Sequence, residues 1–185
     1  DITMAVSIVI NSKTSRPHAC NAVDTLLIHS DLASSLLKHL SIELYKAEVE
    51  MRCDSKTVEI LKEIENCKYV PSNSKDWGKE FLSLTLAIKI VDSLEEALSH
   101  IEKYGSGHTE TVVSENYSVA MDFLDKVDSS VVLVNASTVF NDGGQLGLGA
   151  EVAISTNKLH ARGPMGLIAL TSYKWTVLGT GQLRV

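Results

Sequence analysis

The sequence has few aromatic residues, few prolines and no stretch of concentrated positive charge. Aromatic residues make up 5% of its 185 positions, and there are three prolines. No apolar run approaches the roughly 20 residues that a membrane-spanning helix needs, so we expect no membrane partner. The 17 lysines and arginines are scattered through a chain of net charge −6, whereas nucleic-acid binding needs a concentrated basic face. We therefore expect no nucleic-acid partner.

Disulfide, metal and nucleotide signatures are also missing. The three cysteines, Cys20, Cys53 and Cys67, form no C-x-x-C pair and have no histidine at zinc-ligand spacing, so neither a disulfide frame nor a metal site is expected. This cysteine usage predicts a reducing, cytoplasmic compartment. Residues 1–4 lack both an initiator methionine and the features of a signal peptide, and we interpret them as lying within a longer chain. No Walker A or G-x-G-x-x-G motif is present, so this chain alone predicts no nucleotide site.

Helix and strand patterns alternate, which predicts an α/β domain over residues 1–185 with a mostly parallel sheet flanked by helices. Helices are expected over 2–12, 94–104 and 117–127, the second of them between Ser93 and Gly105, and a weaker one over 58–64. A further helix is expected to begin at Asp31, which caps it, and to bury a stripe formed by Leu32, Leu36, Leu37 and Leu40. Expected strands are 25–29, 48–51, 84–91, 111–113, 131–134 and 173–178, the last at an edge or in a partner's sheet. Residues 68–79 are expected to form an exposed loop.

Cys20 is the first candidate for chemistry. It lies between a predicted helix and a predicted strand, in the run Arg16-Pro17-His18-Ala19-Cys20-Asn21. A loop cysteine beside arginine and histidine can have a lowered pKa, and the thiolate is the nucleophilic form. The alternative is an inert thiol, which on spacing alone is the commoner case. Cys53 and Cys67 have no distinctive neighbours and are interpreted as bystanders.

Polar residues in three later loops are further candidates. His108 is either an acid or phosphate ligand, or a hydrogen-bonded structural residue. Asn135, Ser137 and Thr138 follow a predicted strand, and α/β sheets bind ligands at the carboxyl ends of strands; a turn that ends the strand explains them equally well. Arg162, in a segment rich in glycine and proline, either binds an anion or holds its loop through backbone carbonyls.

Taken together, these segments resemble the γ-glutamyl phosphate reductases of the aldehyde dehydrogenase superfamily along essentially the whole chain. The matching runs are Arg16-Pro17-His18-Ala19-Cys20-Asn21-Ala22 with Thr25-Leu26-Leu27, then 91–110, Asn135-Ala136-Ser137-Thr138, Gly147-Leu148-Gly149-Ala150-Glu151 and 154–166. These runs are long and specific, and they favour Cys20 as a nucleophile.

The resemblance implies an aldehyde-dehydrogenase-like catalytic domain that reduces L-glutamate 5-phosphate to L-glutamate 5-semialdehyde and phosphate with NADPH, in proline biosynthesis. Cys20 matches the family's catalytic cysteine, which forms a thioester that hydride then reduces. Glu80 resembles the glutamate that holds the nicotinamide ribose, and a solvated glutamate is the alternative. The expected substrate contacts are Asn135, Ser137, Thr138, His108 and Arg162.

Two departures from the family pattern stand out. The family usually has an arginine where this chain has Val139. The superfamily's nucleotide-binding portion precedes the cysteine and is absent here, so the isolated chain is expected to be inactive. The alternative function is a non-catalytic folding and oligomerisation module, with residues 171–185 as the oligomerisation segment of a homo-oligomer. An oxidising aldehyde dehydrogenase is a weaker third interpretation, because the residues around Cys20 match the reductase subgroup.

Overall fold

The computed structural model describes residues 1–64 and 67–185 of the chain. The elements in chain order are α1 (Ile2–Thr14), β1 (Thr25–His29), α2 (Ser30–Lys46), β2 (Glu50–Cys53), α3 (Ser55–Leu61), β3 (Tyr69–Pro71), β4 (Thr85–Val91), α4 (Leu94–Tyr104), β5 (Thr109–Val112), α5 (Tyr117–Lys126), β6 (Val131–Val134), the 3-10 helix η1 (Thr138–Phe140), β7 (Ala153–Ser155) and β8 (Gly163–Met165). The predicted α/β alternation is confirmed. Within the described residues, no helix is long and apolar enough to cross a membrane.

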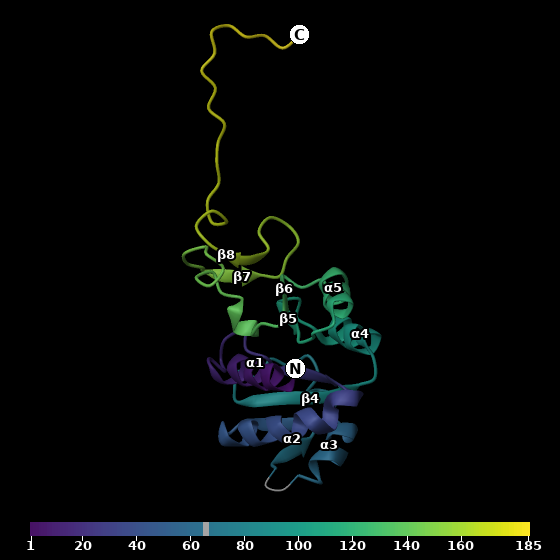
Figure 1. Cartoon of the computed structure of the whole chain (residues 1–185). Helices are drawn as coiled ribbons and strands as arrows, with labels where there is room; N and C mark the ends of the chain where they lie inside the picture. The colour runs from purple at the N-terminus through teal and green to yellow at the C-terminus, as the bar shows by residue number, and fades with distance from the viewer. Residues whose placement is uncertain (65–66) are drawn as a thin grey trace.

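The central element is β4, in a four-stranded parallel sheet of order β1-β4-β2-β3. Leu86, Ala87 and Ile88 on this strand have no exposed surface. The sequence predicted such burial on both faces, because the run 84–91 is almost continuously apolar. Helix α1 covers one face of the sheet, and α2 and α3 cover the other (Figure 1).

Helix α2 departs from the prediction at its start. The capping residue is His29, whose Nδ1 accepts a hydrogen bond from the backbone N–H of Asp31 at 3.2 Å, so Asp31 lies in the first turn instead. A carboxylate in the first turn is favourable beside the positive end of the helix dipole. Leu32 was expected in the buried stripe but is 51% exposed. The buried face begins one residue later, at Ala33, and continues at helical spacing.

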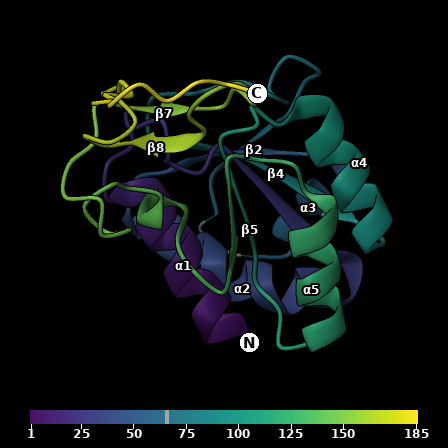
Figure 2. The same ribbon diagram turned by 90° about the horizontal axis from the view of Figure 1, so that it is seen from above.

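A second parallel pair, β5 and β6, follows the large sheet. Helix α4 leads into it, and its predicted start after Ser93 is confirmed, because the Ser93 hydroxyl accepts a hydrogen bond from the N–H of Glu96 at 3.1 Å. The reciprocal bond of a capping box is not formed, since the Glu96 carboxylate accepts from the N–H of Asp92. Helix α5 connects the two strands. Figure 2 shows α4 and α5 side by side, across the molecule from α1. The antiparallel pair β7–β8 then leads into the C-terminal residues.

One secondary-structure prediction is wrong, and a second is not confirmed within the single chain. Residues 68–79 contain β3, an edge strand whose last residue, Pro71, has no N–H; an edge position tolerates this. Residues 173–178 form no strand, and 171–185 have neither helix nor strand. This segment runs away from the body of the molecule (Figure 1), so no neighbouring strand is present to pair with its backbone.

Candidate active site

Three of the candidate residues gather at the amino ends of strands, whereas the sequence favours a carboxyl end only for the candidates that follow β6. Cys20 lies in the segment before β1, Glu80 in the segment before β4, and His108 directly before β5. The loop after β6 runs back to the same region, where Thr138 and Asn141 bond to residues beside Cys20 and His108. The site is therefore formed by three amino-terminal strand ends and one returning loop.

Cys20 is exposed, within two successive turns between α1 and β1. Burial of part of the thiol raises the pKa of Cys20, and the carboxylates of Glu151 and Glu80 raise it further. This direction is opposite to the lowering that Arg16 and His18 suggested. The His18 ring bonds instead to the carbonyl oxygen of Leu82 at 2.5 Å, which ties the cysteine loop to the segment that carries Glu80.

The loop after β6 interlocks with the cysteine loop. The hydroxyls of Ser12 and Ser137 lie 2.8 Å apart, and the N–H of Thr138 donates to Ser12 Oγ at 3.1 Å. The Thr138 hydroxyl donates to the carbonyl oxygen of Asn21 at 2.6 Å. The hydroxyls of Ser137 and Thr138, which were expected to meet a substrate, thus bond to Ser12 on α1 and to Asn21 beside Cys20.

A buried lysine fixes the other side of the loop. Lys13, at the end of α1, has no exposed surface. Its ammonium donates to the carbonyl oxygen of Val23 at 2.9 Å and lies 3.1 Å from a carboxylate oxygen of Asp24. The same Asp24 oxygen accepts from the N–H of Phe81 at 3.2 Å. Lys13 and Asp24 therefore connect the end of the Cys20 loop to the residue after Glu80.

His108 is buried beside this arrangement. Its Nδ1 lies 2.6 Å from the Thr109 hydroxyl, which also accepts a hydrogen bond from the Asn141 amide at 2.7 Å. The backbone carbonyl of Asn141 in turn accepts from the Asn21 amide at 3.0 Å. Burial lowers the pKa of His108, and the charges of Glu80 and Glu151 partly oppose that shift. A continuous polar network therefore runs from the neighbour of Cys20 to His108.

Two carboxylates share this region. Glu80 is exposed in the segment before β4. Glu151 accepts a hydrogen bond from the N–H of Gly143 at 2.8 Å, which holds it against the loop after η1. Both charges act on the pKa of Cys20 and on that of His108. The surroundings of the thiol are therefore negative.

Asn135 and Arg162 are engaged elsewhere. Asn135 has a left-handed backbone, with φ 53°, and its amide both accepts from the N–H of Ser114 and donates to the carbonyl of Ser114, each at 2.9 Å. Arg162 donates to the carbonyl oxygen of Asp128 at 3.0 Å and pairs with its carboxylate at 2.8 Å. Asn135 thus closes a turn, and Arg162 holds its loop against the end of α5.

Sequence reasoning missed most of the supporting network. Asn21 and Glu151 lie in the runs that carry the family resemblance, so a closer examination of those runs could have singled them out. Lys13 had a weaker signal, as a charged residue close to the apolar face of a predicted helix. Thr109 lies in such a run as well, but Asn141 had no signal, because only the fold brings the two within 2.7 Å of each other.

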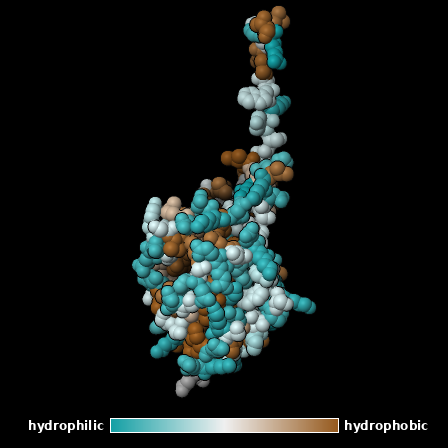
Figure 3. Space-filling view, turned by 90° about the vertical axis from the view of Figure 1, so that its right-hand side faces the viewer, coloured by the Kyte–Doolittle hydropathy of each residue, from teal (hydrophilic) through white to brown (hydrophobic). Residues whose placement is uncertain are grey.

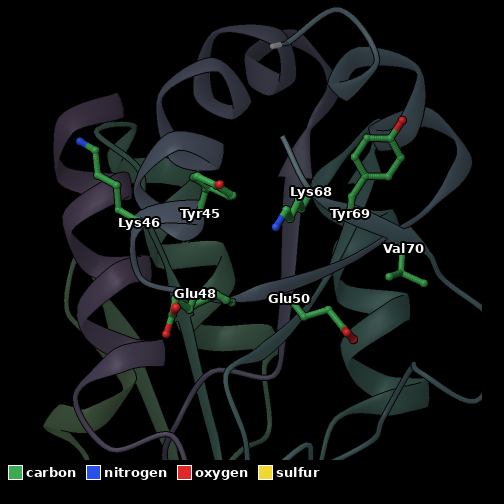
Figure 4. A pocket seen from close by; sticks show the side chains of 8 residues that line it. Tyr45, Lys46, Glu48, Glu50, Lys68, Tyr69 and Val70 are labelled. Atoms are coloured by element: carbon green, nitrogen blue, oxygen red, sulfur yellow. The ribbon is translucent and has the colours of Figure 1, made fainter. Parts of the chain in front are cut away.

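A hollow of about 520 Å³ lies elsewhere, beside the start of β2 and β3. Figure 4 shows Lys68 pointing toward Tyr45, with Glu48 and Glu50 on the other side of the opening. The Lys68 ammonium lies 5.6 Å from the centre of the Tyr45 ring. None of the candidate residues lines this hollow, so it does not extend the site around Cys20.

The chain is similar to known proteins over its whole length. No protein-family model matches the chain. The γ-glutamyl phosphate reductase of Dehalococcoides mccartyi is 56% identical over 184 residues, which are 100% of this chain and 43% of that protein. The corresponding protein of Thermoanaerobacter pseudethanolicus is 50% identical over 181 residues, 98% of this chain and 42% of its own length.

Solved structures extend the comparison. The crystal structure of γ-glutamyl phosphate reductase from Thermotoga maritima matches with a TM-score of 0.91 and 47% identity, covering 100% of this chain and 43% of that one. An acetylating aldehyde dehydrogenase from Geobacillus thermoglucosidasius matches with a TM-score of 0.71 and 19% identity over 100% of this chain and 49% of that one, which shows the fold alone. The chain spans less than half the length of these relatives, and over its whole extent it corresponds to a part of the γ-glutamyl phosphate reductases, with the aldehyde dehydrogenase fold.

Proposed function

We propose that this chain is the cysteine-bearing part of an enzyme that reduces L-glutamate 5-phosphate to L-glutamate 5-semialdehyde and phosphate, as its relatives' names suggest. One observation carries the proposal: Cys20 is the exposed thiol, and hydrogen bonds hold its loop on both sides. Cys53 is buried in the core. An exposed, fixed thiol is what nucleophilic catalysis requires.

The chemistry proposed for Cys20 is acyl transfer. The exposed thiol loses its proton to solvent, and the thiolate attacks the acyl carbon of the substrate. A carbon–sulfur bond forms while the carbon–oxygen bond to phosphate breaks, and phosphate leaves with the electron pair. Sulfur suits this role because it attacks well and later leaves well. The raised pKa of Cys20 keeps most of the thiol protonated at neutral pH, so this step gains rate as pH rises.

NADPH is the proposed reductant, and the chain's own contribution to holding it is Glu80. This carboxylate is exposed and close enough to affect the pKa of Cys20. A carboxylate accepts hydrogen bonds, so it fits the hydroxyls of a ribose. When bound, the cofactor supplies the hydride that reduces the acyl group. Glu80 would orient the ribose, and the rest of the nucleotide requires residues beyond this contact.

The remaining site residues divide by their contacts. We assign Ser137 and Thr138 to positioning, because both bond to the segments that frame Cys20. Asn135 and Arg162 are proposed to shape their own loops, since Ser114 and Asp128 already engage their polar groups. His108, whose Nε2 has no hydrogen bond within the described part of the chain, is the substrate contact that we retain.

Self-association is a second candidate function, favoured by the C-terminal residues 171–185. Tyr173, Trp175 and Val177 are each more than 80% exposed and lie on alternate positions. Figure 3 shows the apolar residues of this extension standing clear of the body of the molecule. Alternate residues of an extended chain share one face, so this segment fits strand addition to a second copy. The three free thiols support a cytoplasmic location for the assembly.

Acetyl phosphate tests the acyl-transfer proposal without any nucleotide. Incubation of the chain with this small acyl phosphate, followed by peptide mapping, should place an acetyl thioester on Cys20. Hydroxylamine should remove it, because thioesters react with that nucleophile. Cys20→Ala should abolish the modification, while Cys67→Ala should leave it unchanged. Equal acetylation of Cys20 and Cys67 would show that exposure alone governs the reaction and would contradict the proposal.

A further inference from the structure

His108 is a buried histidine with one nitrogen engaged and the other not. It is 9% exposed, and its Nδ1 lies 2.6 Å from the Thr109 hydroxyl. Its Nε2 is fully enclosed and bonds to no group among residues 1–64 and 67–185. A buried ring nitrogen without a partner is costly in a folded protein, which makes such a group a candidate for ligand contact.

The Thr109 hydroxyl determines which nitrogen carries the proton. The Asn141 amide donates to this oxygen at 2.7 Å. Within the described residues the Thr109 oxygen bonds only to Asn141 and His108, so His108 Nδ1 is the acceptor available to the hydroxyl proton of Thr109. The neutral ring then carries its proton on Nε2.

The opposite arrangement is less satisfactory. It would make His108 Nδ1 a second donor to the Thr109 oxygen, and the Thr109 proton would then have no acceptor among the described residues unless the Asn141 amide were reversed. Asn141 has no exposed surface, and reversal would remove the 2.7 Å hydrogen bond that its amide donates to Thr109. The observed orientation leaves one carbonyl oxygen unpaired instead, and under-satisfied carbonyls are the commoner case in proteins.

The surroundings keep the ring neutral. Burial lowers the pKa of His108, and the two charges that act on it in the opposite direction are Glu80 and Glu151. A neutral N–H group can donate a hydrogen bond to a ligand oxygen without itself adding a buried charge.

We infer that Thr109 and Asn141 hold His108 as the Nε2–H tautomer, and that this N–H donates a hydrogen bond to an anionic oxygen of the ligand that Cys20 attacks. This inference rests on the proposed function. The polar network from Asn21 through Asn141 and Thr109 links the donor to the neighbour of the thiol. The oxygen belongs either to a carboxylate or to a phosphoryl group, which share this chemistry.

The tautomer is testable on the unmodified chain. Long-range proton–nitrogen correlation spectra distinguish a protonated from an unprotonated ring nitrogen, and His108→Gln identifies the resonances of this histidine. At neutral pH we expect a protonated Nε2 and an unprotonated Nδ1. A protonated Nδ1 with a bare Nε2, or a doubly protonated ring, overturns the inference.

Two probes then identify the source of the oxygen. L-Glutamate supplies carboxylates and inorganic phosphate supplies the phosphoryl oxygens. A saturable shift of the Nε2 resonance with either probe supports the donor role, and the responding probe names the group. No shift with either probe overturns it, because the enclosed nitrogen then serves only the fold or a water molecule.

A matched pair of variants distinguishes the loss of the Thr109 hydrogen bonds from the general effect of removing a hydroxyl from this strand. Thr109→Val should shift the tautomer population and weaken binding of the responding probe about tenfold. Thr111→Val, on the same strand, removes a hydroxyl that donates to the carbonyl of Ala136 at 2.8 Å and should change affinity less than about twofold. Equal weakening by both variants overturns the inference.

The same experiments distinguish this failure from failure of the proposed function. If Cys20 accepts an acetyl group from acetyl phosphate while the Nε2 resonance of His108 shifts with neither probe, only the proposed donor role of His108 is contradicted. If Cys20 is not acetylated, the acyl-transfer proposal fails first, and any response of His108 describes an anion site without catalysis.

Discussion

The ammonium of Lys13 lies 3.1 Å from the carboxylate of Asp24, with the lysine side chain entirely enclosed and the aspartate side chain 26% exposed. Burial lowers the pKa of Lys13, and Asp24 opposes the shift. Lys13→Met should therefore reduce the free energy of unfolding by about 2–3 kcal/mol, because it leaves a partly buried carboxylate without its cation. Urea denaturation measures the change.

Lys56→Met is the control for that prediction. Lys56 pairs with Asp92 at 2.7 Å, but both side chains are at least half exposed, so solvent screens the pair and little stability should be lost. The double variant Lys13→Met with Asp24→Asn should recover part of the loss. If Lys13→Met and Lys56→Met are equally mild, the buried pair does not support the cysteine loop.

Cys20 should react fastest of the three thiols with iodoacetamide. It is the exposed cysteine, whereas Cys53 is 1% exposed and burial raises its pKa to about 12. Because burial also raises the pKa of Cys20, its rate should keep increasing above pH 9, the region in which an unperturbed thiol of pKa about 8.5 levels off. Peptide mapping over a pH series reports each rate. Faster labelling of Cys67 at any pH would remove the case for Cys20.

Glu110 should make the fold less stable as pH rises through neutrality. Burial raises its pKa to about 7, whereas a glutamate in an unfolded chain titrates near about 4.3. Between these values the folded state binds a proton that the unfolded state lacks, so the free energy of unfolding falls with increasing pH.

Glu110→Gln should remove this slope and stabilise the chain by about 2 kcal/mol at pH 8, since no buried charge then forms. Urea midpoints at pH 5 and pH 8 measure the slope. Glu102→Gln, at an exposed position of α4, should leave it intact. A slope that persists in Glu110→Gln assigns the pH dependence to another group.

The C-terminal residues should drive self-association. Trp175→Ala removes a ring that is 87% exposed in the single chain, so it should lower the sedimentation-derived mass at a concentration where the parent chain associates. Thr176→Ala changes the opposite face of the same segment and should have little effect. If the parent chain sediments as a monomer at all concentrations, the segment serves no contact between copies.

The sequence predicts the fold best where a strand is buried on both faces. The run 84–91 is apolar on both faces, because α1 covers one face of the sheet and α2 and α3 cover the other (Figure 1). β3 escapes prediction because its three residues lie in a stretch of turn-forming residues and pair on one side only. Apolar and polar residues alternate over 173–178, as they do in a strand. A strand also needs a neighbouring strand with which to pair, and the alternation does not show whether one is present.

The candidate site is predictable only in part, for a related reason. Cys20 is visible in the sequence because its neighbours form a specific run. The environment of Cys20 is not visible in the sequence, because Thr138 and Asn141, which bond to the cysteine loop, lie more than a hundred residues away along the chain. The rule that ligands lie at the carboxyl ends of strands also misleads for Ser137 and Thr138, because their hydroxyls bond to other residues of the chain.

The register of β1 against β4 has a consequence for how the site comes into being. Thr25 pairs with Ala87, so the pairing closes a loop of roughly 60 residues whose entropy must be lost before the contacts form. Cys20 lies just before the first end of that loop, and Glu80 lies inside it, close to the other end. Their proximity therefore has no local precursor during folding. It arises with the long-range nucleus of the sheet, and any fluctuation that separates these two strands dismantles the site together with the core.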